Sequence, residues 1–224
     1  MAVTEQTPAS RVPWRPAHPR GGSITGGGTT GNERLTAVTG GVLIVLLAVI
    51  GVTLLRLRPL LSVHMFVGML LIGPVALKLA STGYRFARYY TADPVYRRKG
   101  PPAPGLRMIA PIVILTTVVV FASGVALLFV GPSSRDTLLP IHKVSFIIWV
   151  GFTALHVLAH LPRVPRALRA DYGRPAGLSS DITGRTGRVL SLAGALIAGL
   201  VLAILVLPEF GPWLHSSGLF NNHG

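Results

Sequence analysis

Histidine and lysine side chains that could hold a metal cofactor occur inside two of the long apolar runs of this chain. They are His64 and Lys78 in the run 59–81, and His142, Lys143, His156 and His160 in the run 138–161. An ionisable side chain inside a membrane span is costly, so each is by default a functional candidate. The spacing repeats between the two runs: His64 and Lys78 are fourteen positions apart, as are His142 and His156.

A fourteen-residue interval places both members of each pair on one face of a helix. Fourteen steps of about 100° end some 40° short of full turns, and they cover about 21 Å along the axis. If the two helices run parallel and face each other, His64 meets His142 near the outer membrane surface. Lys78 then meets His156 near the inner surface. Two imidazoles from facing helices can ligate a haem iron from both sides.

The elements that carry these residues are predicted to be membrane helices. Half of the residues are hydrophobic, 12% are charged, and the mean hydropathy is +0.58, whereas soluble domains carry about 25% charged residues. Five apolar runs approach the length of about 20 residues that a spanning helix needs; they are 35–55, 59–81, 108–130, 138–161 and 189–207. We therefore predict an all-α polytopic bundle with five spans and haem between the second and the fourth.

The flanking segments and their charges set the expected topology. Residues 1–34 are rich in Gly, Pro and Arg and are predicted to be a disordered tail; 35–207 form the transmembrane domain and 208–224 a short extracytoplasmic tail. Arg and Lys concentrate in the N-terminal tail and in the second and fourth loops, which places the N-terminus in the cytoplasm. The expected location is a bacterial plasma membrane.

Composition also excludes several classes of site. The net charge of +14 comes from arginines between apolar runs, so we expect a lipid bilayer as partner and no nucleic acid. The chain has no cysteine, which excludes iron–sulfur clusters and covalently attached haem. The segment TGYRFARYYTADPVYRRKG interleaves aromatic rings with arginines, a pattern typical of an interfacial anchor, or alternatively of a docking site for a soluble partner.

The spacing of the histidines on two parallel spans resembles that of the membrane cytochromes b, such as the b subunits of hydrogenases and formate dehydrogenases. The resemblance covers roughly residues 35–161 and rests on spacing and topology. It implies haem b, with His64 and His142 as axial ligands of an outer haem and His156 as a ligand of an inner haem. It also implies electron exchange with quinone or a partner oxidoreductase, within a larger membrane complex or alone.

Lys78 departs from that pattern, because a lysine stands where a second histidine is expected. A deprotonated lysine can ligate iron. Alternatively, Lys78 extends to the inner headgroups, pairs with a haem propionate, or accompanies an empty inner site. Arg56 and Arg58 precede the helix of His64 on the outer side. They are candidates for binding haem propionates, or they cap a loop exposed to water.

Other small and ionisable residues have weaker assignments. His160 lies one turn after His156 and could replace it as a ligand, whereas His18, His215 and His223 lie in polar tails. Glycines in the spans would leave room for a flat macrocycle or would let helices approach closely; they include Gly40, Gly41, Gly51, Gly68, Gly124 and Gly151.

Two further hypotheses belong to other functional classes. The chain could be a cofactor-free membrane subunit that anchors or assembles a complex, with its histidines in interhelical hydrogen bonds. It could also be a small transporter that uses His64, Lys78 and His156 as a proton relay. The relay is disfavoured because no acidic residue lies inside a span. Iron content separates the haem-binding hypothesis from that of a cofactor-free subunit.

Overall fold

The computed structural model describes residues 28–91, 93–98, 104–160 and 185–215, and all of its elements are helical. Two long helices come first, followed by a short α3, Pro94–Arg98, and three more long helices. The five long helices are α1 Gly28–Leu55, α2 Leu61–Tyr90, α4 Pro104–Val130, α5 Arg135–His160 and α7 Arg185–Leu205. Short 3₁₀ turns at Pro132–Ser134 and Leu207–Phe210 and the helix α8, Gly211–His215, complete the described chain.

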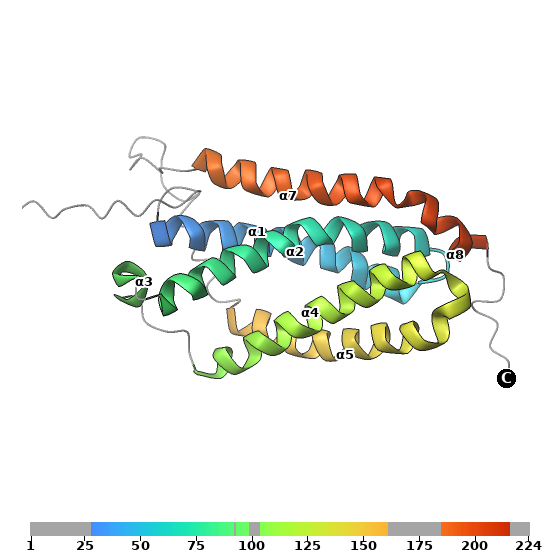
Figure 1. Cartoon of the computed structure of the whole chain (residues 1–224), viewed down its shortest axis with the longest axis horizontal. Coiled ribbons are helices and arrows are strands. Elements are labelled where there is room, and N and C mark those ends of the chain that lie inside the picture. Colours follow the sequence, from blue (N-terminus) through green and yellow to red (C-terminus); the bar gives the residue numbers. More distant parts are fainter. Residues whose placement is uncertain (1–27, 92, 99–103, 161–184, 216–224) are drawn as a thin grey trace, which may run out of the picture.

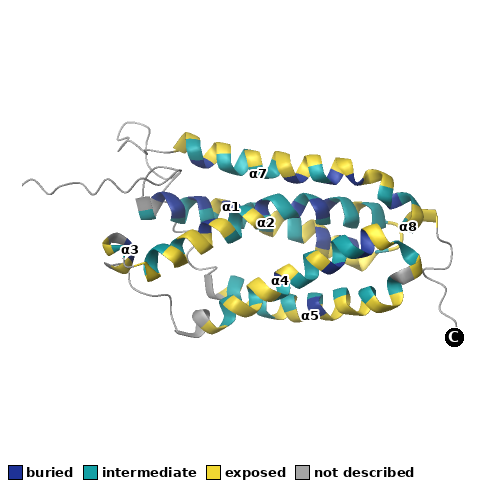
Figure 2. Cartoon of the chain, in the orientation of Figure 1, coloured by how far each residue is buried: buried dark blue, intermediate teal, exposed yellow. Residues whose placement is uncertain are grey.

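All five long helices are long and apolar enough to cross a membrane. Their outward faces carry large apolar side chains, such as Leu55, Ile147 and Leu205, which are 83%, 67% and 70% exposed. Figure 2 shows these exposed faces along the flanks of the bundle, with buried residues concentrated along α1 and α2. An apolar surface of this extent on helices of spanning length is typical of a protein whose solvent is lipid. The predicted all-α bundle with five spans is confirmed.

The helices extend beyond several of the predicted bounds. α1 begins at Gly28 instead of residue 35, because the polar residues of its first turns bond to α2. α2 continues past residue 81 to Tyr90, so Arg85, Arg88 and the aromatic rings before residue 91 lie on this helix, whereas Tyr96, Arg97 and Arg98 lie on α3. After α7 the chain does not leave the bundle at once, since Phe210 is buried against its end.

The long helices are arranged as two hairpins and a fifth helix (Figure 1). α1 and α2 form one hairpin, α4 and α5 the other, and α7 packs along α2. Figure 1 shows α7 on one side of the α1–α2 pair and α5 on the opposite side of the bundle. α2 and α5 run in the same direction, as predicted. Within the described residues, however, α5 packs on α4, and its direct contact with α2 is at most marginal.

A close crossing fixes α7 against α2. A Cβ atom at Gly73 would clash with the carbonyl oxygen of Ala195, and one at Gly199 would clash with that of Leu70. Helix backbones can approach this closely only where side chains are missing, so these two glycines are required by packing. Beyond the crossing, Met69, Leu128, Ala203, Val206 and Phe210 form a core cluster that joins α2, α4 and α7.

Candidate functional site

His64 lies in the first turn of α2 and is bound to α1. Its Nδ1 is 2.9 Å from the hydroxyl oxygen of Thr53, and that hydroxyl is 2.6 Å from the carbonyl oxygen of Ile50, to which it donates. A hydroxyl has one proton to donate, so the Thr53 oxygen accepts from His64 Nδ1–H. In the neutral imidazole the proton is therefore on Nδ1, and Nε2 keeps its lone pair for a ligand.

His142 has the same arrangement in the second hairpin. Its Nδ1 is 3.1 Å from the carbonyl oxygen of Val120 and 3.1 Å from the hydroxyl oxygen of Ser123, both on α4. A carbonyl oxygen only accepts, so Nδ1 carries the proton here too. Gly124 makes room for the ring, since a Cβ at that position would be 3.1 Å from His142 Cε1. The structure thus leaves Nε2 as the lone-pair nitrogen of both imidazoles.

The two histidines lie at the same end of the bundle, which we call the turn end because both hairpin turns are there (Figure 1). Both side chains are half-buried. Each ring is held by the other helix of its own hairpin, His64 by α1 and His142 by α4.

Lys78 is bound to α1. Its ammonium donates to the carbonyl oxygen of Thr36 at 2.6 Å, and a Cβ at Gly40 would be 3.1 Å from its Nζ. The glycine leaves the space that the ammonium fills. Among the contacts described for Lys78, the bonding partner therefore lies on α1, the helix that the short turn places beside α2.

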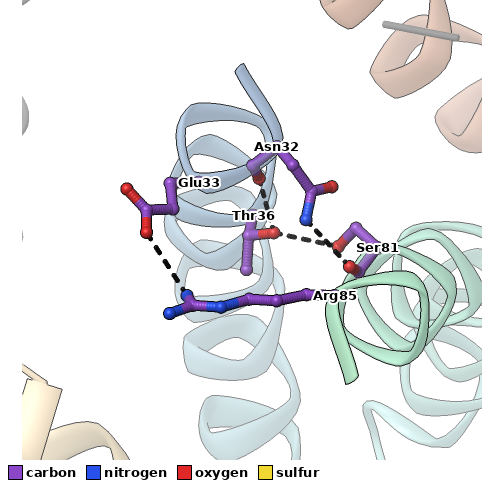
Figure 3. Close-up of polar contacts among 5 residues, drawn as sticks. All are labelled: Asn32, Glu33, Thr36, Ser81 and Arg85. Carbon is purple, nitrogen blue, oxygen red and sulfur yellow. Dashed lines mark hydrogen bonds and ion pairs between the residues drawn. The ribbon is translucent and has the colours of Figure 1, made fainter. Parts of the chain in front are cut away.

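The contacts of Lys78 belong to a polar cluster between α1 and α2 at the end opposite the turns. The side-chain amide of Asn32 donates to the carbonyl oxygen of Ser81 at 3.0 Å, and the hydroxyls of Thr36 and Ser81 are 3.0 Å apart. Figure 3 shows these bonds together with the ion pair of Glu33 and Arg85, at 3.5 Å. The polar residues at these helix ends therefore hold α1 and α2 together.

The remaining candidates are distributed over both ends of the bundle. Arg56 and Arg58 lie in the turn between α1 and α2, at the end that carries His64, and both are exposed. His156 is half-buried on α5, toward the opposite end. The side chain of His160, like residues His18 and His223, lies outside the described part. His215 is exposed, and its Nδ1 is 2.8 Å from the carbonyl oxygen of Gly211.

The donor set suits a metal that brings most of its own ligands. Within the described residues, no group of three or more His, Asp or Glu side chains gathers around a common point, so a bare zinc or iron ion would lack ligands there. A porphyrin supplies four equatorial nitrogens and needs only two axial donors from the protein. Two imidazoles with Nε2 lone pairs, such as those of His64 and His142, are donors of that kind.

Several residues that shape the site were not predicted from the sequence. Thr53 and Ser123 are small hydroxyl residues inside apolar runs, which carry no distinctive signal by type. Thr117 is another: it accepts a 2.8 Å hydrogen bond from Trp149 Nε1 and so ties α4 to α5. Only their position in the sequence marks them, because each lies across a hairpin from the side chain that it binds.

Comparison of the chain with protein-family models, with curated proteins and with solved structures finds no match.

Proposed function

We propose that this chain is a membrane-integral b-type cytochrome that holds one haem b between His64 and His142 at the turn end of the bundle. It would transfer electrons between quinone in the bilayer and a partner oxidoreductase, alone or as a subunit of a larger complex. The observation that carries the proposal is that both imidazoles have the same hydrogen-bonding arrangement. Each is fixed through Nδ1–H to a neighbouring helix, which leaves Nε2 to ligate a metal.

The protein's own groups would each have a defined task at such a site. His64 and His142 would hold the haem iron through Nε2, and the acceptors on α1 and α4 orient their rings. Arg56 and Arg58, exposed at the same end, are placed to pair with propionates. Gly68 lies one turn after His64, and a Cβ there would meet no other atom, so helix packing does not require a glycine. When bound, haem iron accepts and releases one electron at a time.

We propose one haem per chain because of the contact that Lys78 makes. The ammonium donates to the carbonyl oxygen of Thr36, so it is engaged on α1 and is not offered to an iron beside His156. A second haem would therefore lack one of its two axial ligands from this helix pair. We place the turn end on the outer side of a bacterial plasma membrane and the N-terminus in the cytoplasm, from the distribution of Arg and Lys in the sequence.

The same contacts also favour a second candidate function, that of a cofactor-free anchor or assembly subunit. The bonds of His64 to Thr53 and of His142 to Val120 each join two helices, and interhelical hydrogen bonds of this kind stabilise membrane bundles by about 0.6 kcal/mol on average. In that function Nδ1 would be the important nitrogen of each ring. In a haem protein, Nε2 is indispensable as well.

Asparagine substitutions separate these two functions. The side-chain amide of asparagine has N–H donors near the position of imidazole Nδ1 and nothing at the position of Nε2. The full-length protein is purified in detergent as wild type, His64→Asn and His142→Asn. His215→Asn is the matched control, because His215 is exposed and its Nδ1 lies against the carbonyl oxygen of Gly211 within α8. The readout is the reduced-minus-oxidised absorption spectrum.

The proposal predicts b-type bands in the wild type and in His215→Asn, and their loss in both other variants, while all four proteins remain folded and monodisperse. Absence of the bands from wild-type protein produced with haem supplied would overturn the cytochrome proposal and favour the anchor function. Retention of wild-type bands in His64→Asn or His142→Asn would remove that residue as an axial ligand.

A further inference from the structure

The hydroxyl of Thr53 is in a position to decide which nitrogen of His64 can bind a metal. In the described part of the chain, Thr53 is the one hydrogen-bond partner of His64 Nδ1. Thr53 is 1% exposed, so water does not compete for its hydroxyl. Its own proton is committed to the carbonyl oxygen of Ile50 at 2.6 Å. It can therefore accept from Nδ1–H and cannot donate to a bare Nδ1.

We infer that Thr53 is a positioning residue, which holds His64 as its Nδ1–H tautomer and so presents Nε2 as the ligating nitrogen. The inference rests on the proposed function and deepens it, because it assigns control of ligand basicity to a residue outside the iron's ligand set. A ligating histidine whose other N–H donates to an acceptor is a stronger electron donor to the metal. Such a ligand favours the oxidised iron and lowers the reduction potential.

The two histidines differ in how strongly their hydrogen bonds fix the tautomer of the ring. His142 Nδ1 has two acceptors, the Val120 carbonyl and the Ser123 hydroxyl, and the carbonyl alone fixes its proton. His64 Nδ1 has only the Thr53 hydroxyl, and the carbonyl of Ile50 is satisfied by that same group. Removal of the Thr53 hydroxyl should therefore release His64, whereas removal of the Ser123 hydroxyl should leave His142 in the same tautomer.

The chain offers a matched control for this hydroxyl. Thr39 lies on the same helix α1, is 0% exposed, and donates to the carbonyl oxygen of Leu35 at 2.8 Å. It differs from Thr53 in having no histidine partner. Thr53→Val and Thr39→Val therefore remove the same group from the same kind of environment. Thr53→Ser restores the hydroxyl, and Thr53→Ala provides a second deletion in case the valine variant does not fold.

Two readouts on full-length protein test the inference. The first is histidine ¹⁵N NMR of haem-free protein in detergent, where the shifts of the ring nitrogens report which one is protonated. The second is haem affinity and midpoint potential of the haem-loaded protein. Thr53→Val should populate the Nε2–H tautomer of His64, weaken haem binding about 10-fold or more, and raise the potential. Thr53→Ser, Thr39→Val and Ser123→Ala should retain the wild-type tautomers.

The outcomes separate this inference from the proposed function. Haem bound by wild-type protein, with a tautomer and potential that do not change in Thr53→Val or Thr53→Ala, overturns the role of Thr53 and leaves the cytochrome proposal standing. An equal change in Thr39→Val also overturns it, because the effect would then be general to α1. A wild-type protein that binds no haem, but whose His64 tautomer still responds to Thr53, overturns the cytochrome proposal alone.

Discussion

Gly124 offers a test of His142 that leaves every polar group of the site in place. A Cβ atom at this position would lie 3.1 Å from His142 Cε1 and 3.5 Å from its Nδ1. Ordinary van der Waals contact begins at 3.4 Å, so in Gly124→Ala the ring must retreat by about 0.3 Å or more. The ring is also held at Nδ1 by two bonds of 3.1 Å. It cannot move away from α4 without stretching them.

The size of the effect follows from those bonds. A hydrogen bond of this kind contributes about 0.5–1.5 kcal/mol, and 1.4 kcal/mol corresponds to a tenfold change in affinity. We therefore expect Gly124→Ala to weaken haem binding by about 2- to 10-fold. The same substitution should not destabilise the helix, because alanine is favoured over glycine in a helix interior by about 0.5–1 kcal/mol.

The assay is titration of haem-free protein with haem, combined with thermal unfolding. Gly151→Ala is the matched control, since it lies on α5 and a Cβ there would meet no other atom. It should keep wild-type haem affinity. Wild-type affinity in Gly124→Ala would refute the position assigned to the His142 ring. Equal losses in the two variants would show that the effect does not depend on contact with His142.

Three further predictions concern the rest of the bundle. Gly73→Ala should destabilise the fold by about 1–3 kcal/mol, because its methyl group would clash with the carbonyl of Ala195; denaturation in detergent measures this, and an unchanged midpoint would contradict the close crossing of α2 and α7. Lys78→Met should retain haem and lose about 0.5–1.5 kcal/mol of stability, because it removes the bond to Thr36; loss of haem in this variant would instead make Lys78 part of the cofactor site. Gly68→Leu should leave the haem-free protein folded, since space is open there, and should reduce haem content; wild-type haem content would show that the macrocycle does not lie beside this residue.

The spans were predictable because lipid imposes a single requirement on all of them. Each needs a continuous apolar run that satisfies its own backbone, and five such runs stand out in the composition. The helix ends were not predictable in the same way. α1 starts at Gly28 and α2 ends at Tyr90 because polar residues outside the apolar runs pair with each other, as Asn32 does with Ser81.

The hydroxyl partners of the histidines could have been located from register. The two helices of a hairpin run antiparallel, so residues equally distant from the turn lie at equal depth. Thr53 lies three residues before the turn 56–60 and His64 four residues after it. Ser123 and His142 each lie eight residues from the turn 131–134. The depth of each pair is therefore fixed by the chain itself.

The rotation of each helix about its axis could not be obtained from the sequence. Lipid and protein interior are both apolar, so hydrophobic periodicity does not show which face of a span is inside. The fourteen-residue spacing correctly places His64 and Lys78 at two depths of α2. It does not show that Lys78 bonds to α1, which depends on the gap left by Gly40.

The amount of haem iron per polypeptide tests the central claim most directly. Pyridine haemochrome absorbance and iron content are measured on the same purified full-length protein, produced with haem supplied, for the wild type and for His64→Asn. We predict one haem per chain in the wild type and none in the variant. No haem in the wild type, or the same stoichiometry in both proteins, would contradict a haem held by His64 and His142.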